Sequence, residues 1–500
     1  MKRFFEIIPG ALAWATIILM FVLSWLTPTW ISVFIILFDI YWLLKTIYLS
    51  LHLRVAFTNM RKNLKIDWLQ KARAAGERGR RFGNLHHLII FPMYDEPYGV
   101  VKESFARLAE AHYPLDRMMV VLATEARAGD AAAATAKQIG DEFGGKFARF
   151  LVTVHPGDLP GEIPGKGSNE SWAARRAMEE LVEPARIPHE NVLVSVFDVD
   201  TQIFPEYFGR LTAAFLEAKN PLRAIYQPIP FFTNNIHEAP ALARVTAFST
   251  TFWQMMQQAR PERLTSFSSQ STPLPALIDM GFWDRDIVSE DSRVFWQGYL
   301  AYHGDFRVEP LFYPIAMDAN VAPTWWGTMK NLYKQQRRWG WGAENIPYML
   351  EGFRRDPLIP KAKKRYWTFS VIEGFHSWAT NSLMIFALGW LPLFLGGRNF
   401  NYTLLSYNLP YITRFIISLS MIGIVSSAIL AIILLPPKEE GMRFRPWEYA
   451  WYFLQWALMP ITLIIFGAFP GLEAQTRLML GGRARLGFWV TPKGRYRDAV

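Results

Sequence analysis

The sequence predicts a Rossmann-like α/β domain inserted between groups of transmembrane helices. Apolar runs long enough to cross a bilayer lie near both ends of the 500-residue chain. Between them, over residues 84–345, short β-branched runs alternate with helical patterns. Each run ends in polar residues, as strands of a parallel nucleotide-binding sheet do.

The composition supports a chain with both a soluble and a membrane part. Hydrophobic residues make up 51% and charged residues 19%, which is too apolar for an ordinary soluble enzyme. The formal net charge is +10, but the basic clusters flank apolar runs. The positive-inside rule therefore explains them better than a nucleic-acid partner does. The absence of cysteine excludes disulfides, thiolate zinc sites and a thiol nucleophile.

The first apolar runs, at about 8–26 and 30–53, predict a helical hairpin. Lysines and arginines follow Leu53, so the N-terminus and the next segment are expected in the cytosol. The expected segments are a transmembrane hairpin 1–53, a basic linker 54–83, a cytosolic α/β domain 84–345, an interfacial helix with a basic collar 346–366, transmembrane helices 367–470 and a basic cytosolic tail 471–500.

Two indications conflict about the side of the membrane on which the tail lies. Three further spans, at about 369–395, 412–435 and 449–469, would carry it out of the cytosol. Its arginines and lysines favour the cytosol instead, and we give them more weight. One apolar run is then interfacial or re-entrant, or is a hairpin broken at Pro392 or Pro460.

Within the soluble domain the sequence predicts alternating strands and helices. Residues 267–273 are expected to form a polar loop. Neither a Gly-x-Gly-x-x-Gly after the first strand nor a Walker A motif is present, which disfavours dinucleotide and P-loop sites. The expected strands are 85–91, 117–123, 150–154, the apolar run from Asn191, 223–229 and 306–310; the main expected helices are 100–111, 131–143, 168–181 and 241–259.

The predicted site centres on Asp198-Val199-Asp200. In an extended chain residues i and i+2 face the same side, so the two carboxylates point together beyond the end of a strand. Such a pair is suited to hold Mg²⁺ or Mn²⁺ against a diphosphate. By itself it is equally typical of a strand-end turn or a helix cap.

Four other motifs accompany this pair in a fixed order. In this order the five resemble the membrane-embedded family 2 glycosyltransferases, the group of cellulose and hyaluronan synthases, over about residues 84–345. The resemblance implies a GT-A catalytic domain on the cytosolic side. The other motifs are Pro92-Met-Tyr-Asp-Glu96, Gly165-Lys166-Gly167 with Asn169, Ser289-Glu290-Asp291 and Gln335-Gln-Arg-Arg338-Trp339.

The resemblance also implies roles for the matched residues. Asp291, with Glu290 beside it, corresponds to the catalytic base, and Asp200, helped by Asp198, to the metal site. Glu125 stands where the family usually has Asp, which weakens the case for a uracil nucleotide, and Ser289 replaces the usual Thr. The implied donor-binding residues are Tyr94, Asp95, Glu96, Glu125, Lys166, Asp198, Gln335, Arg338 and Trp339.

Each of these residues also has a structural interpretation. Asp95 and Glu96 would cap a helix, and Lys166 would be a solvated loop residue. The Glu290-Asp291 pair suits a helix N-terminus. Arg338 would pair with lipid phosphate and Trp339 would anchor at the interface.

These features predict an inverting, metal-dependent glycosyltransferase of the inner (plasma) membrane. It would move a sugar from a nucleoside diphosphate to a glycan, as in processive polysaccharide synthesis. The first alternative is transfer of a single sugar to a lipid. The second is a non-catalytic membrane scaffold that binds nucleotide sugars. The expected partners are the nucleotide-sugar donor, the acceptor and the lipid bilayer, with no nucleic acid.

Overall fold

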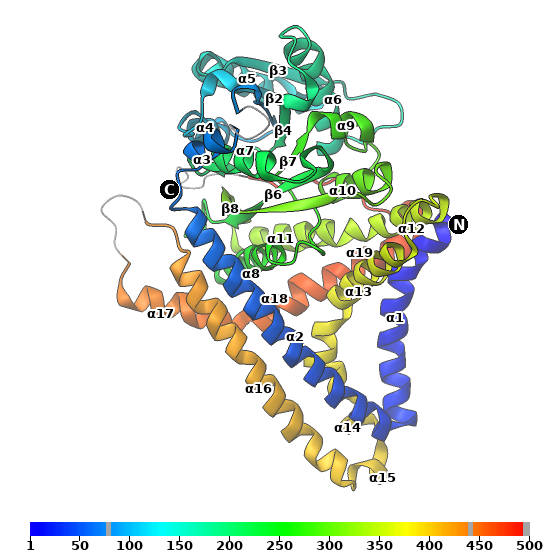
Figure 1. Ribbon diagram of the computed structural model, residues 1–500. Helices are drawn as coiled ribbons and strands as arrows, with labels where there is room; N and C mark the ends of the chain where they lie inside the picture. Colours follow the sequence, from blue (N-terminus) through cyan, green and yellow to red (C-terminus); the bar gives the residue numbers. More distant parts are fainter. Residues whose placement is uncertain (77–81, 439–443, 494–500) are drawn as a thin grey trace.

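The computed structural model describes residues 1–76, 82–438 and 444–493. Parts of the expected basic linker and tail, at 77–81 and 494–500, lie outside the described residues. An α/β domain sits at one end of the molecule, and long apolar helices extend away from it (Figure 1). The α/β fold predicted from the sequence, a Rossmann-like domain between apolar helices, is confirmed.

The domain is built on one eight-stranded sheet in the order β3-β2-β1-β4-β7-β6-β8-β5. The first four strands in this order are parallel, so their carboxyl ends meet at one edge. Strand β7 is antiparallel to both of its neighbours, while β6 and β8 run parallel to each other. The strands are β1 (His86–Pro92), β2 (Met118–Glu125), β3 (Arg149–His155), β4 (Val192–Val196), β5 (Gln202–Ile203), β6 (Ala224–Phe232), β7 (Gln270–Pro273) and β8 (Arg307–Met317).

Alternate side chains of the central strands enter two cores, one on each face of the sheet. Ile89 and Phe91 join the first core, whereas Leu88 and Ile90 join the second. This is the period of two that a strand buried on both faces requires. The first core is covered by α4 (Tyr98–Ala109), α5 (Gly129–Phe143), α7 (Tyr207–Glu217) and α8 (Ala241–Gln258), and the second by α6 (Lys166–Ala177), α9 (Leu274–Met280), α10 (Glu290–Ala301) and α12 (Asn345–Arg355).

The expectation of a polar loop at 267–273 is wrong in its second half, which forms β7. This strand carries no apolar alternation, since Gln270, Ser271 and Thr272 are all polar and buried. The Ser271 hydroxyl lies 2.7 Å from that of Ser195 on β4 and 3.2 Å from that of Tyr207. A buried hydroxyl contact thus stands where apolar packing was expected, so hydropathy alone does not reveal the strand.

Among the described residues, four helices are long and apolar enough to cross a membrane, and a fifth candidate counts a bent pair as one span. That pair is α13 (Lys361–Phe386) with α14 (Leu391–Leu395), bent by 46° before Pro392. The other four candidates are α1 (Lys2–Leu26), α2 (Pro28–Asn63), α16 (Leu404–Ile433) and the segment 446–480.

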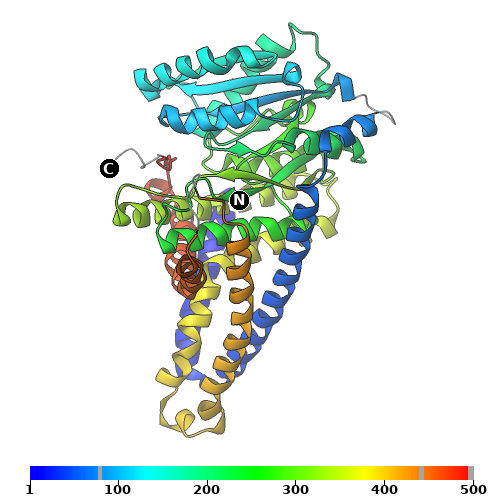
Figure 2. The same cartoon turned by 90° about the vertical axis from the view of Figure 1, so that its left-hand side faces the viewer.

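The segment 446–480 runs across the other apolar helices rather than along them (Figures 1 and 2). It comprises α17 (Pro446–Leu454), α18 (Met459–Leu463) and α19 (Phe469–Leu480), with Pro460 in the first turn of α18. The chain then returns to the α/β domain, where Lys493 pairs with Asp200. Residue 493 therefore lies on the same side of the helices as the domain. This agrees with the basic residues of the tail and with an interfacial final run.

Three further helices complete the described chain, and one of them, α15 (Gly397–Asn401), lies at the end of the apolar helices away from the domain (Figure 1). α11 (Trp325–Gly340) lies between the sheet and α19, where the Arg337 guanidinium is 2.7 Å from the Glu473 carboxylate. The hydroxyl of Tyr333 donates to the same carboxylate at 2.9 Å. The remaining helices are α3 (Trp68–Gly76), which packs on α7, and α15, which precedes α16.

Candidate active site

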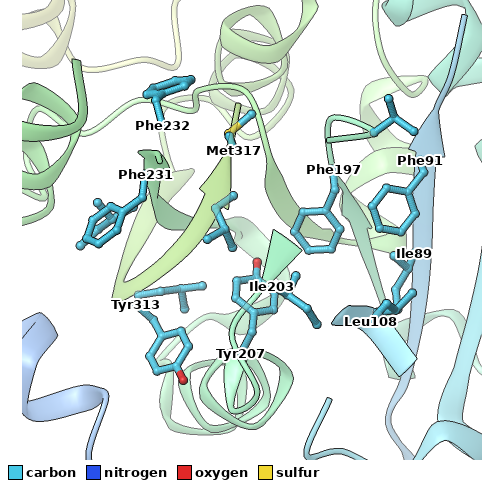
Figure 3. Packing of buried hydrophobic residues seen from close by; sticks show 14 of the residues in the cluster. Ile89, Phe91, Leu108, Phe197, Ile203, Tyr207, Phe231, Phe232, Tyr313 and Met317 are labelled. Atoms are coloured by element: carbon cyan, nitrogen blue, oxygen red, sulfur yellow. The ribbon is translucent and has the colours of Figure 1, made fainter. Parts of the chain in front are cut away.

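The core positions the central carboxylates. Phe197 and Val199 are fully or almost fully buried in the first core, and Phe197 lies 5.7 Å from Phe91, ring centre to ring centre (Figure 3). Strand β4 ends at Val196, and Asp198 begins a turn in which the Thr201 amide donates to the Asp198 carbonyl at 2.8 Å. Phe197 and Val199 enter the core, while Asp198 and Asp200 pair with Lys166 and Lys493. Both carboxylates thus lie just beyond the carboxyl end of β4.

Asp198 is held by a lysine and two serines. Its Oδ1 is 2.7 Å from the Lys166 ammonium, and its Oδ2 accepts a hydrogen bond from the Ser268 hydroxyl at 2.8 Å. Its backbone amide donates to Ser269 Oγ at 3.1 Å. Burial raises the pKa of Asp198, but Lys166 and Lys493 outweigh this effect and hold the pKa well below its usual range.

Asp200 is 1% exposed and has two partners. Its Oδ2 accepts a hydrogen bond from the backbone amide of Asp318 at 3.0 Å. Its Oδ1 pairs with the ammonium of Lys493, which comes from the C-terminal segment. Burial lowers the pKa of Lys493, but Asp200, Asp198 and Glu96 outweigh it, so the pKa rises and the ammonium stays charged.

Lys166 joins the aspartate pair to the acidic motif of α10. Its ammonium lies 3.3 Å from Glu170 and 3.8 Å from Glu290. Burial lowers the pKa of Lys166, yet Asp198, Glu170 and Glu290 together keep it well above the ordinary value. This close approach needs the neighbouring glycine, because a Cβ on Gly167 would lie 2.9 Å from the Glu290 Cβ.

The two carboxylates of the acidic motif have different surroundings. Glu290 is 2% exposed, and burial together with the charge of Asp291 raises its pKa well above the usual value. The attraction of Lys166 and Arg338 opposes this rise without cancelling it. Asp291 is only partly buried, and its Oδ2 accepts from the backbone amide of Ser268 at 2.9 Å. Ser268 thus contacts Asp198 through its hydroxyl and Asp291 through its amide.

A second cluster lies at the ends of β1 and β2. Arg127 forms a two-point ion pair with Glu125, at 2.6 and 3.1 Å, and its guanidinium lies 4.4 Å from the centre of the Tyr94 ring. Asp95 is exposed beside them. Glu96 accepts from the Tyr94 backbone amide at 2.8 Å, and burial raises its pKa.

On the side of the site that faces the apolar helices, α11 contributes Arg338 and Trp339. The Trp339 ring lies 6.0 Å from Phe232 and 5.6 Å from Phe267. Arg338 has a buried Nε without a hydrogen-bond partner, and its charge lowers the pKa of Glu290 against the effect of burial. Gln335, one turn earlier, is partly buried and forms no hydrogen bond with the described residues.

The C-terminal segment closes over these residues. Phe488 lies 5.6 Å below the Arg338 guanidinium and touches the backbone of Gly165, where an added Cβ would be 2.8 Å from the ring. Trp489 lies 5.1 Å from the Lys334 ammonium. The structure therefore brings the predicted motif residues to one edge of the sheet in two adjoining clusters. It leaves Gln335 without a polar contact to either.

Sequence reasoning missed Glu170, Ser268 and the segment ending at Lys493. Glu170 follows Lys166 by four residues, the spacing at which helical side chains meet, so this contact had a local signal. The aromatic pair Phe488-Trp489 inside a basic tail was a weaker signal. Asn169, expected near the donor, instead donates its Nδ2 to the Ala123 carbonyl at 2.8 Å and is 1% exposed.

The residues at the aspartate pair fit a hard divalent cation. No group of three histidine or acidic residues suited to a metal occurs in the described parts of the chain. Mg²⁺ nevertheless needs only one or two carboxylates when substrate phosphates supply further oxygens. The Lys493 ammonium at Asp200 shows that this position accepts a positive charge.

Comparisons with known proteins give short or distant likenesses, and no family model matches the chain. Poly-beta-1,6-N-acetyl-D-glucosamine synthases of Staphylococcus aureus, for example those of strains COL and N315, are 32% identical over 71 residues. These residues are 14% of this chain and 15% of the relatives. The chain thus matches only a small part of the length of these relatives.

Two solved structures match the chain at low identity and with low TM-scores. Mannosyltransferase PcManGT from Pyrobaculum calidifontis, in complex with GDP-Man and Mn²⁺, has a TM-score of 0.40 and 12% identity, covering 83% of this chain and 99% of that one. TarS 1–349 from S. aureus, in complex with UDP-GlcNAc, has a TM-score of 0.37 and 13% identity, covering 72% and 93%. At this distance we base the function on the residues of the chain itself.

Proposed function

We propose that this chain is a membrane-bound glycosyltransferase that takes a sugar from a nucleoside diphosphate. The supporting observation is the convergence of Asp198, Lys166 and Asp291 at the carboxyl edge of a parallel sheet. Ser268 and Glu290 join these groups. Ligands of open α/β sheets bind at this edge. Cationic and carboxylate groups together suit a diphosphate leaving group and a hydroxyl that must lose its proton.

The reaction is a displacement at the anomeric carbon. A bond forms from the acceptor hydroxyl oxygen, and the bond to the diphosphate oxygen breaks with its electron pair remaining on the diphosphate. The hydroxyl proton passes to the Asp291 carboxylate, while Glu290, 3.8 Å from the Lys166 ammonium, helps to position that lysine. A single displacement of this kind inverts the anomeric carbon.

The other residues bind the donor and exclude water. Asp200, with Asp198, would hold Mg²⁺ or Mn²⁺, which when bound neutralises charge on the diphosphate. Lys166 and Arg338, which both act on Glu290, supply fixed positive charge. Trp339, supported by Phe232 and Phe267, offers an aromatic face for the acceptor sugar.

The nucleotide base is expected near Tyr94 and Glu125. Arg127 pairs with both oxygens of Glu125, so this carboxylate is not free to accept a hydrogen bond from the base alone. A panel of nucleotide-sugar donors identifies the base. The similarity to polysaccharide synthases favours a glycan product over a single-sugar lipid, although it covers 71 residues only.

The test is a panel of radiolabelled nucleotide sugars given to the purified full chain with Mg²⁺ or Mn²⁺. We expect one donor to release its nucleotide, and Asp291→Asn to lower turnover by about 10²–10⁴ while donor binding persists. Asp305→Asn, which changes an exposed carboxylate paired with Arg223, is the matched control. Undiminished turnover in Asp291→Asn would exclude Asp291 as the base, and product mass separates a polymer from a single-sugar lipid. Metal-dependent donor binding without any turnover would instead favour the scaffold.

A further inference from the structure

A pocket of about 360 Å³ lies where α2 and α16 meet the α/β domain, outside the candidate active site. Its lining within the described chain combines three cationic side chains with two apolar ones and contains no carboxylate. The Arg61 guanidinium lies 5.9 Å from the centre of the Phe57 ring, so the cations border an apolar wall. The lining residues are Phe57, Thr58, Arg61, Lys62, Lys65 and Ile433.

Below the pocket the two helices continue with exposed apolar residues. On α2, Ile47, Leu51 and Val55 are 50%, 58% and 52% exposed. Their spacing of four places them on one helical face, which leads to Thr58 and Lys62. On α16, Val425 and Ile429 follow Ile433 downward at the same spacing and are 46% and 49% exposed. Charge at the domain end and apolar side chains below form an amphiphilic surface.

We propose that this pocket binds the headgroup of an anionic membrane phospholipid. The phosphate would lie between Arg61, Lys62 and Lys65, where its charge is complementary to the lining. The acyl chains would cover the exposed stripes on α2 and α16, which a soluble anion would leave in contact with water. The site is independent of the proposed glycosyl transfer and requires only that α2 and α16 lie in a bilayer.

The position of the cations supports a headgroup rather than a general positive flank. Arg61 and Lys65 are separated by four residues across the end of α2, which stops at Asn63, so they converge on the same opening. All three cations are exposed at the level where the apolar stripes end. Phosphate groups of a bilayer lie at this boundary between apolar and polar surface.

The experiment measures lipids retained by the full chain after reconstitution with phosphatidylglycerol or phosphatidylcholine and return to detergent, read by native mass spectrometry. We expect phosphatidylglycerol to be retained preferentially. The variant Arg61→Gln/Lys62→Gln/Lys65→Gln should lose at least about tenfold in this retention, since one basic residue near an anionic surface contributes roughly fivefold.

Two further variants isolate the pocket. Lys146→Gln/Arg149→Gln/Lys219→Gln removes the same charge from exposed positions of the α/β domain and should retain the lipid like the parent chain. Arg61→Lys/Lys62→Arg/Lys65→Arg keeps the charge and should also retain it. If the neutral triple variant fails to fold, Lys65→Gln alone, at a position beyond the end of α2, should still lose about fivefold.

Three results would overturn the proposal: equal retention of the two lipids, unchanged retention in the neutral variant, or the same loss in the Lys146/Arg149/Lys219 variant. Inorganic phosphate distinguishes a headgroup from a free anion. Millimolar phosphate should leave the bound phosphatidylglycerol in place, and its displacement would assign the pocket to a soluble anion instead.

Discussion

Lys493 pairs with Asp200 across 293 residues of sequence, so the C-terminal segment reaches the centre of the candidate active site. The contact joins a carboxylate that is 1% exposed to an ammonium in the same buried environment. A divalent cation bound by Asp200 would meet this charge at close range. The segment and the metal are therefore expected to compete for Asp200.

The first prediction concerns this competition. Lys493→Gln should bind Mn²⁺ about tenfold more tightly, because the carboxylate no longer has to give up an ammonium. The measurement is the rise in melting temperature of the full chain during a Mn²⁺ titration. Lys493→Arg keeps the charge and should behave like the parent chain. If Lys493→Gln and the parent chain bind Mn²⁺ with the same affinity, the Lys493 ammonium does not compete with the metal for Asp200.

The second prediction concerns Ser268, which has a φ of +49°, in the left-handed region. Ser268→Ala and Ser268→Gly both lose the hydroxyl that donates to Asp198, and both should lower activity. Ser268→Gly should be the more stable of the two by roughly 1 kcal/mol, because glycine adopts positive φ without strain. Thermal unfolding checks the order. Equal stability, or a more stable alanine variant, would contradict the strain at this position.

The third prediction concerns pH. Burial raises the pKa of Glu170 to about 7 in the folded chain from an ordinary value of 4.5. Between these values the folded state holds a proton that the unfolded state has released. The contribution of Glu170 to stability is therefore most favourable below the unfolded pKa and falls as pH rises toward the folded pKa.

Glu170→Gln removes this titration, so its melting temperature should fall less than that of the parent chain between about pH 5 and 7. Glu180→Gln, which changes a partly exposed carboxylate paired with Arg176, is the control and should follow the parent. Parallel pH profiles for the parent and Glu170→Gln would mean that Glu170 titrates in its ordinary range.

The fourth prediction concerns the binding of the nucleotide base. Arg127→Lys keeps a charge beside Glu125 but loses the two-point geometry and the guanidinium over Tyr94. We expect the KM for the donor to rise about tenfold with a much smaller change in kcat, because uniform binding is lost. Steady-state kinetics with the donor found in the panel gives both values. Arg107→Lys, at an exposed pair with Glu110, is the control. A fall in kcat at constant KM would contradict a role of Arg127 in binding the nucleotide base.

The sequence predicted what depends on local pattern. The alternation Phe197-Asp198-Val199-Asp200 predicted that the two apolar residues enter the core, which they do. The roles of the two aspartates stay predictions. The parallel strands and their polar ends followed from hydrophobic runs in the same way. The Lys166–Glu170 pair was within reach of the same reasoning, since it has helical spacing.

The parts that were not predicted depend on distant partners. Strand β7 is polar, and its Ser271 hydroxyl is satisfied by Ser195 and Tyr207, which are far away in sequence. The contact of Lys493 with Asp200 has no local pattern at either end. Charge counting indicated the side of the helices on which the tail lies. It did not indicate that the tail enters the site.

Ser268 fixes a dimension of the site. Its hydroxyl contacts Asp198 and its own amide contacts Asp291, so one residue spans the distance between the carboxylate on the diphosphate side and the proposed base. In the proposed site, the separation of these two carboxylates therefore depends on a single residue of the loop that precedes β7. Substitutions of Ser268 are therefore expected to change the size of the donor sugar that the proposed site accepts.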